Sequence, residues 1–205
     1  MSATEALQGR LWDEWRRITR FLESGRVAFA RERDLWAGLE LVNPDAVKLN
    51  VPPEGRSAGR GYRIGLPSHQ AALADEELFH TAVLLHTYAL TEAVSHEALA
   101  LRGVTFGTGI ESWGLALLRS CPGSTGPSWW SDAVVEADLV ETVVHRNVFA
   151  HGQRHLDERA VARLHRVGRT TWQTGDEVFL AYDALRVHRA RLRQLLRDGG
   201  LGTDR

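Results

Sequence analysis

The sequence predicts an all-α protein, a bundle of four or more helices with a small β-hairpin inserted near residues 46–66. Apolar residues recur at helical spacing in several segments, and turn-forming residues separate these segments. Strand-like alternation is confined to one stretch. With 205 residues, 43% of them hydrophobic, the chain is long enough to bury a core and is expected to form one domain, residues 1–205.

Two helices are expected before the hairpin. Ser2 and Glu5 form a capping box, and the apolar pattern that follows them ends at Gly25. A second helical pattern covers residues 27–41 and ends before Asn43-Pro44, where proline disfavours a helix.

The hairpin is expected from two short alternating segments, residues 46–51 and 61–66. The segment between them, residues 52–60, is rich in proline and glycine and is typical of a turn. The sequence therefore predicts a two-stranded insertion in a helical protein.

Five more helices are expected after the hairpin. Their periodic segments are bounded by glycine, proline and capping residues, including a capping box of Thr108 with Glu111 and a loop at 120–128. The expected ranges are 71–101, from 108 through Leu118, 131–151, 157–167 and 176–197.

Charge is unevenly distributed along the chain. Residues 1–145 have a balance of −6, and residues 146–205 a balance of +5 with histidines counted as neutral. A basic carboxy-terminal third indicates either a binding surface for a phosphate backbone or a solvated helix face, and both alternatives stay open. Nearly all of the positive charge is arginine, whose planar fork suits phosphate.

The composition favours a cytoplasmic protein. Cys121 is the only cysteine, so an intramolecular disulfide is impossible, as suits a reducing compartment. The first residues have no basic start followed by an apolar run, and the most apolar stretch, residues 81–90, is too short to span a bilayer.

One segment, Val144-His-Arg-Asn-Val-Phe-Ala-His-Gly152, carries a specific pattern. Arg146 is followed directly by Asn147 and, three residues later, by His151. Asparagine is rare in this chain, so this spacing rarely arises by chance. Looser arginine-to-histidine matches start at Arg63, in the hairpin, and at Arg159, in a short polar helix.

The segment resembles the signature of the HEPN superfamily, in which an arginine, often followed by asparagine, precedes a histidine near the end of a bundle helix. The resemblance implies a metal-independent endoribonuclease with no cofactor, in which the ribose 2′-hydroxyl attacks the phosphate. In that chemistry His151 acts as base or acid, Arg146 stabilises charge on the phosphate, and Asn147 holds the imidazole or a phosphate oxygen.

The resemblance also implies partners. Such proteins usually act as toxins or phage-defence effectors on cellular RNA, and their composite site is formed by two bundles of a homodimer. An antitoxin or another regulatory partner is then expected to restrain the enzyme. The alternative is a non-catalytic HEPN-like bundle that binds RNA or dimerises.

Helix geometry separates the two main residues. Arg146 and His151, five residues apart, point about 140° from each other on a straight helix, whereas Asn147 and His151 share a face. The pair can therefore converge only if the helix unwinds near Gly152 or if a second subunit supplies the partner residues.

Further candidates remain open. Arg154 and His155 either bind RNA phosphates or are exposed loop residues, and Glu92 either orients Arg146 or lies on the surface. Metal sites are disfavoured, because Glu77-x-x-His80 has no second copy and Gly152 interrupts the His151–His155 pair. Tryptophans could stack on bases, but four of them have helical spacing that favours the core: Trp12, Trp15, Trp36 and Trp113.

Overall fold

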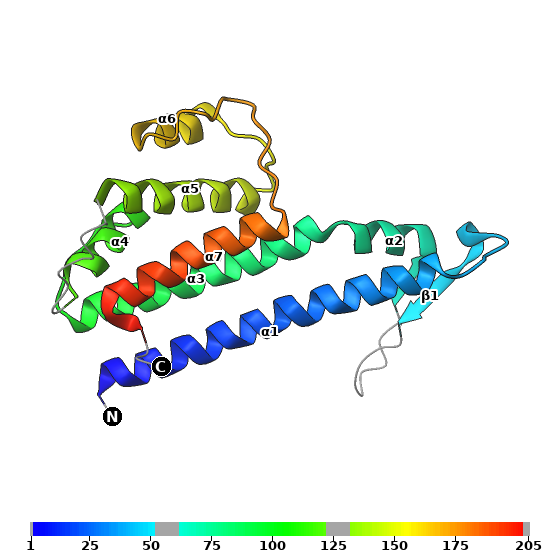
Figure 1. Ribbon diagram of the computed structural model, residues 1–205, viewed down its shortest axis with the longest axis horizontal. Coiled ribbons are helices and arrows are strands. Elements are labelled where there is room, and N and C mark those ends of the chain that lie inside the picture. Colours follow the sequence, from blue (N-terminus) through cyan, green and yellow to red (C-terminus); the bar gives the residue numbers. More distant parts are fainter. Residues whose placement is uncertain (1, 52–61, 122–131, 203–205) are drawn as a thin grey trace.

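The computed structural model describes residues 2–51, 62–121 and 132–202 (Figure 1). Within these ranges the protein is mostly helical and has one two-stranded sheet, which confirms the predicted all-α class with a hairpin. The helices are α1 (Ala3–Ala37), α2 (Leu66–Ala74), α3 (Glu76–Leu101), α4 (Ile110–Arg119), α5 (Asp132–Ala150), α6 (Glu158–Arg166) and α7 (Tyr182–Leu196). The remaining elements are a 3₁₀ turn η1 (Pro44–Ala46), strands β1 (Lys48–Val51) and β2 (Tyr62–Gly65), and a π-helical turn η2 (Arg197–Leu201).

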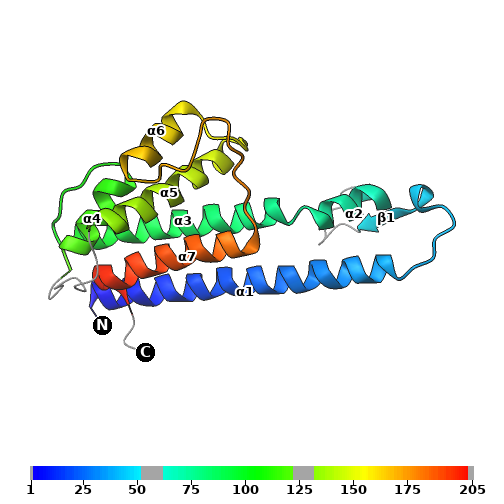
Figure 2. The ribbon, with the colours of Figure 1, turned by 45° about the horizontal axis from the view of Figure 1, so that its top comes forward.

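Helices α3 and α7 lie side by side at the centre of the bundle (Figures 1 and 2). Helix α1 lies on one side of this pair, and α5 lies on the other, with α4 packed at one end of α5 and α6 outermost. Helix α1 extends beyond the bundle to α2 and the hairpin, so the hairpin is far from the end of α5.

Helix α1 is a single continuous helix, so the predicted end at Gly25 and the separate helix over 27–41 are wrong. The capping box of Ser2 and Glu5 is present at its start. Gly25 faces α3, where an added Cβ would lie 2.4 Å from Cζ of Phe79. The glycine therefore serves close packing, and its propensity cost of about 1 kcal/mol does not end the helix.

The hairpin has the expected position. Strands β1 and β2 pair antiparallel, with Lys48 opposite Gly65 and Val51 opposite Tyr62. The predicted turn at residues 52–60 lies outside the described residues.

The predicted helix over 71–101 is divided at Asp75. Asp75 has φ −84° and ψ 69°, which are not helical angles, and α3 begins directly after it with two glutamates in its first turn. Acidic residues favour a new helix amino terminus at this point through the helix dipole. Helix α2 begins earlier than predicted, at Leu66, with proline in its first turn.

The predicted capping box of Thr108 and Glu111 does not form. Gly109 caps α4, and no side-chain hydrogen bond caps this terminus. Both carboxylate oxygens of Glu111 instead accept hydrogen bonds from Arg163 of α6, at 2.7 Å each. The ion pair between helices therefore replaces the local cap.

The predictions for the later helices are correct for α5 and α6 to within a residue and partly wrong for α7. Asp157 caps α6 and accepts a hydrogen bond from the backbone of Ala160. Helix α7 begins at Tyr182 rather than near 176, because residues 176–181 are held extended by hydrogen bonds to the segment before α6 and to α3. Most of the predicted loop at 120–128 lies outside the described residues.

The main core lies between α1, α3, α4, α5 and α7. Trp12, Trp15 and Trp113 are buried there, as predicted, and Trp113 is fully enclosed. Trp36 is only half-buried and donates a hydrogen bond to Glu32, so its assignment to the core is wrong. In the described part of the chain, no helix combines the length and apolar character needed to cross a membrane.

Candidate functional site

The motif lies in the last turns of α5, which a buried apolar stripe holds in place. Val140, Val144 and Val148 recur at four-residue spacing and pack in one cluster with Val161 and Leu164 of α6. This stripe fixes the rotation of α5 about its axis. Arg146, Asn147 and His151 therefore flank the stripe and remain at least partly accessible.

The end of α5 is closed without unwinding. The backbone N–H of His151 still bonds to the carbonyl of Asn147 at 3.1 Å. Gly152 has φ 64°, and the N–H groups of Gly152 and Gln153 bond back to the preceding turn at 3.0 and 2.9 Å. This is the arrangement that ends many helices at a glycine. One of the two routes by which Arg146 and His151 could converge, a local unwinding, is therefore absent.

Arg146 is half-buried and turned toward α3. Its Nη1 donates a hydrogen bond to Oδ1 of Asn147 at 2.8 Å, and its guanidinium carbon lies 4.9 Å from the ring centre of Tyr88. Its Nε is buried and has no hydrogen-bond partner among the described residues. The Arg146 side chain is thus held by a ring and a neighbouring amide while one buried donor remains unsatisfied.

Tyr88 has charged neighbours on several elements. Burial raises the pKa of the Tyr88 hydroxyl, the charge of Glu92 raises it further, and the charge of Arg146 acts in the opposite direction. Glu92 and Arg146 therefore both act on Tyr88, but no ion pair within 4 Å joins them in the described part of the chain. Of the two alternatives for Glu92, the structure does not show a contact through which it would orient Arg146.

Asn147 and His151 line a hollow of about 320 Å³ between the end of α5 and the start of α6. Arg159 and Arg163 line it from α6. Arg163 is fixed by its two hydrogen bonds to Glu111, so its guanidinium is already oriented. The hollow thus contains an exposed imidazole, an amide and two guanidinium groups, and also the carboxylate of Asp157, which accepts the capping hydrogen bond of α6. Imidazole, amide and guanidinium groups can all bind a phosphate group.

Arg154 and His155 do not line this hollow. Arg154 forms an ion pair with Glu77 of α3 at 3.3 Å, and Glu77 is only 8% exposed. His155 lies in an isolated bridge with Glu177. The structure therefore brings Asn147 and His151 together, holds Arg146 beside them, and leaves Arg154 and His155 on the adjoining segment.

Glu77 and His80 both contact the backbone of Leu180. The Glu77 carboxylate accepts a hydrogen bond from the backbone N–H of Leu180 at 3.1 Å, and Nδ1 of His80 lies 3.0 Å from the carbonyl of Leu180. These contacts hold the extended segment before α7. No group of three or more His, Cys, Asp or Glu side chains suited to a metal ion occurs among the described residues.

Arg159 and Arg163 were not predicted as site residues. They lie four residues apart on α6 and therefore share a face of this strongly amphipathic helix. The signal that could have identified them is the separation of α6 into one apolar and one basic face. The sequence had offered Arg159 only as the start of a loose arginine-to-histidine match.

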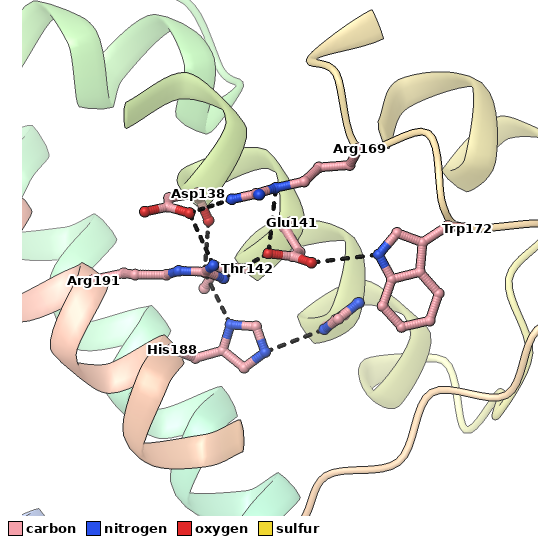
Figure 3. A network of polar contacts seen from close by, with 8 residues as sticks. Asp138, Glu141, Thr142, Arg169, Trp172, His188 and Arg191 are labelled. Carbon is pink, nitrogen blue, oxygen red and sulfur yellow. Dashed lines mark hydrogen bonds and ion pairs between the residues drawn. The ribbon is translucent and has the colours of Figure 1, made fainter. Parts of the chain in front are cut away.

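A second polar group lies on another face of α5 and was also not predicted (Figure 3). It joins α5 to α7 and to the segment that follows α6 through ion pairs and hydrogen bonds. We call it the α5–α7 network; its members are Asp138, Glu141, Thr142, His145, Arg169, Trp172, His188 and Arg191. The four α5 members have spacings of three and four residues, which puts them on one helix face.

Arginines neutralise the acids of this network. Arg191 contacts Asp138 and Glu141 at 2.8 Å each, and Arg169 contacts the same two carboxylates. Burial raises the pKa of Glu141, but the charge and hydrogen bond of Arg191 together with the charges of Arg169 and His145 outweigh burial, and the pKa lies below its ordinary value. Glu141 is therefore a paired carboxylate that also accepts a hydrogen bond from Trp172 at 3.3 Å.

Two buried histidines complete the network. Thr142 donates its hydroxyl proton to the carbonyl of Asp138, so Nδ1–H of His188, at 3.0 Å, donates to the Thr142 oxygen. Nε2 of His188 then accepts from Nδ1–H of His145 at 3.1 Å. Burial lowers the pKa of His145 to about 4 and that of His188 to about 3. Both rings are therefore neutral at neutral pH.

The chain was compared with protein-family models, with curated proteins and with solved structures, and none of them matches it. The chemistry of the motif hollow therefore has to be inferred from the residues that line it.

Proposed function

We propose that this protein is a metal-independent endoribonuclease of the HEPN type whose site is the hollow at the end of α5. The observation that carries the proposal is the placement of His151 and Asn147 in one hollow, with Arg146 bonded to Asn147 beside it. Arg159 adds positive charge on the other wall, where Arg163 is paired with Glu111 and the Asp157 carboxylate also lies. A phosphodiester is the biological group that best fits an imidazole surrounded by guanidinium groups.

The proposed reaction is a transesterification. The ribose 2′-oxygen forms a bond to phosphorus, the bond from phosphorus to the 5′-oxygen breaks, and the products end in a 2′,3′-cyclic phosphate and a 5′-hydroxyl. One imidazole takes the proton of the 2′-hydroxyl, and an acid gives a proton to the 5′-oxygen. Arg146 stabilises the charge that develops on the phosphate oxygens.

A homodimer with a composite site completes this set of groups. Since α5 does not unwind and Arg146 points toward Tyr88, a single chain does not bring Arg146 and His151 to one wall of the hollow. A second copy would supply both a second imidazole, as the required acid, and a second arginine. In the proposed dimer the ends of the two α5 helices lie near the symmetry axis.

The alternative is a non-catalytic HEPN-like module that binds RNA or dimerises. One observation favours it: Arg146 is engaged by Tyr88 and Asn147 within one chain, which suits a structural role. A nuclease assay separates the two functions directly. By the same resemblance, the enzyme is proposed to act as a toxin or antiviral effector that an antitoxin or regulatory partner restrains.

The decisive experiment incubates the purified protein with total RNA in excess EDTA. We expect cleavage by the wild type and a loss of at least about 100-fold in His151→Ala and in Arg146→Ala, the usual scale for removing an acid–base or charge-stabilising group. The matched control is His86→Ala, which removes an exposed histidine on α3 whose partner is the surface residue Glu14. Unchanged cleavage in both site variants would exclude the assignment.

A modified substrate tests the nucleophile separately. A single 2′-deoxy substitution at the scissile nucleotide should abolish cleavage there and leave binding almost unchanged, because only the attacking hydroxyl is lost. Equal cleavage of the deoxy substrate would show that water is the nucleophile and would contradict the proposed reaction.

A further inference from the structure

A basic groove lies between α1 and α7. In Figure 2, α1 runs beside α7 on the side away from α5. Its volume is about 600 Å³, and α1 lines one wall with Trp15, Thr19 and Glu23. The α7 side and the turn after it contribute four arginines that succeed one another every three or four residues, Arg186, Arg189, Arg193 and Arg197. The basic carboxy-terminal third of the sequence thus concentrates part of its charge on one helix face.

Arg189 lies at the floor of the groove and is only 8% exposed. Its Nη2 donates a hydrogen bond to Thr19 at 2.8 Å, and its guanidinium lies 5.3 Å from the ring centre of Trp15. Its Nε is buried without a partner, and burial lowers the pKa of Arg189. In the described part of the chain no carboxylate lies within 4 Å of it. The charge of Glu23 acts on Arg189 from a greater distance and raises its pKa, but less than burial lowers it. A buried cation that is not directly bonded to an anion is costly, so the position favours an anionic ligand.

Arg193 and Arg197 continue the same face and are exposed. The guanidinium of Arg193 lies 5.8 Å from the ring centre of Trp12, and burial together with the charge of Arg197 lowers the pKa of Arg193. Neither forms an ion pair within the described residues. Arg191, on the other face of α7, by contrast binds two carboxylates.

The two carboxylates of the groove lie toward its Tyr182 end. Glu23 accepts a hydrogen bond from the hydroxyl of Tyr182 at 2.9 Å, and Asp183 lies 3.8 Å from the exposed Arg186. The strongest positive charge is therefore at Arg189, Arg193 and Arg197.

We propose that this groove binds consecutive phosphates of single-stranded RNA and so anchors the substrate of the ribonuclease proposed above. Successive arginines lie about 6 Å apart along the helix axis, because α-helices rise about 1.5 Å per residue. That spacing suits an evenly charged strand, and the guanidinium fork suits phosphate oxygens. Trp12 and Trp15 are buried, so they support the guanidinium groups and do not stack on bases.

The groove is connected to the motif helix. Tyr182, at one end of the groove, packs in the same apolar cluster as Phe149 of α5. A strand that follows α7 toward Tyr182 therefore approaches the end of the bundle at which α5 terminates. The inference rests on the proposed function for the identity of the ligand.

The test measures binding of a fluorescein-labelled oligouridine by anisotropy, with all variants made in a His151→Ala background so that the RNA stays intact. The charge-reversal pair Arg193→Glu with Arg197→Glu should raise the Kd at least about tenfold and reduce the salt dependence of log K by about 1.4, or 0.7 per lost phosphate contact. The milder pair Arg193→Gln with Arg197→Gln should show a smaller change in the same direction.

The matched control is Arg31→Glu with Arg166→Glu, which makes the same change in net charge at two exposed arginines outside the groove. We expect the Kd of this control to stay within about twofold of the parent, because arginines outside the groove make no phosphate contact that the substitution would remove. Thermal unfolding followed by circular dichroism verifies that each variant is folded.

Three outcomes overturn the inference. The first is an equal loss of RNA affinity in the groove pair and the control pair, and the second is an unchanged RNA affinity in the groove pair. The third is displacement of the RNA by polyglutamate at matched charge, which would indicate an acidic protein as the ligand. Cleavage of total RNA by the wild type is measured separately. RNA binding that depends on the groove arginines, without cleavage by the wild type, would support the groove as an RNA site and contradict the ribonuclease proposal. Cleavage by the wild type with RNA binding that does not depend on these arginines would support the ribonuclease and contradict the groove proposal.

Discussion

Helix α5 presents two polar faces that differ in how completely their groups are paired. On the face toward α7, Asp138, Glu141 and Thr142 each have a charged or hydrogen-bonding partner (Figure 3). At the carboxy-terminal end of α5, His151 is exposed toward α6, and Arg146, turned toward α3, keeps a buried Nε without a partner. Both faces carry the residue types from which catalytic sites are built.

One face of α5 thus has polar groups that hold the fold together, and the other has polar groups that can bind a ligand. Nε2 of His145 and Nε of Arg169 have no hydrogen-bond partner in the part of the chain that the structure describes, but the charged groups of this network are paired with one another. A buried network of this kind stabilises a unique packing and has little capacity left for a ligand. Groups that are positioned but incompletely paired retain that capacity. The α5–α7 network should therefore respond to mutation in stability, and the motif hollow should respond in activity.

The largest expected effect is a loss of stability with acid in the network. His145 and His188 have pKa values lowered to about 4 and about 3, so the unfolded chain binds more protons below its ordinary histidine pKa of about 6.5. Stability therefore falls as pH falls through this range, by on the order of 4 kcal/mol between about pH 7 and pH 5. Urea unfolding at several pH values measures the slope, and His145→Gln should reduce it. A flat profile would show that the two rings are not buried as neutral groups.

Removing a network acid is expected to cost about 3 kcal/mol. Glu141→Ala leaves Arg191 and Arg169 without one of their two carboxylates, and breaking a largely buried ion pair is strongly destabilising. The control Glu97→Ala removes a surface pair with Arg10 and should cost less than about 1 kcal/mol. Chemical denaturation compares the two, and equal costs would remove the distinction between the faces.

His151→Ala should lower RNA cleavage at least about 100-fold, equivalent to about 2.7 kcal/mol of transition-state stabilisation. Its melting temperature should match that of the wild type, because the side chain is exposed and has no partner among the described residues. Initial rates on RNA together with a thermal melt give both values. A lower melting temperature with an unchanged cleavage rate would show that His151 stabilises the fold and does not act in cleavage.

Gly152→Ala is expected to have the smallest effect, about 1 kcal/mol of stability. The residue has φ 64°, a conformation that an L-residue adopts at a cost, although an added Cβ would meet no atom within 4 Å. Urea denaturation measures the change. A neutral result would mean that the end of α5 relaxes, and the cleavage rate of the same variant would then report whether His151 moves with it.

The fold class, the hairpin and the ranges of α5 and α6 could be predicted from the sequence because local periodicity and capping determine them. The continuity of α1 could not, since Gly25 looks like a helix end until Phe79 is known to pack against it. The late start of α7 likewise depends on a distant carboxylate, Glu77, which binds the backbone of Leu180.

The candidate site was predictable in part. A short motif suggested Arg146, Asn147 and His151 as candidates, and helix geometry correctly placed Asn147 and His151 on one face. Arg163 could not be found in this way, because its position in the hollow depends on the packing of α6 against α5 and on Glu111 of α4. The amphipathic pattern of α6 puts Arg163 on a basic face, but the sequence of α6 alone does not indicate which helix that face lies beside.

The junction between the first turns of α1 and the end of α7 has a consequence for synthesis of the chain. Leu7 and Leu11 pack in one cluster with Leu192, Leu195 and Leu201, and Trp12 donates a hydrogen bond to the carbonyl of Leu201 at 2.7 Å. A ribosome releases α1 and α3 before α7, and Val94 and Leu99 of α3 belong to the same cluster, so α3 covers this apolar face of α1 first. The part of the face that contacts Leu192, Leu195 and Leu201 stays open until these residues have emerged, and the bundle therefore closes only when two segments far apart in the sequence have both been synthesised.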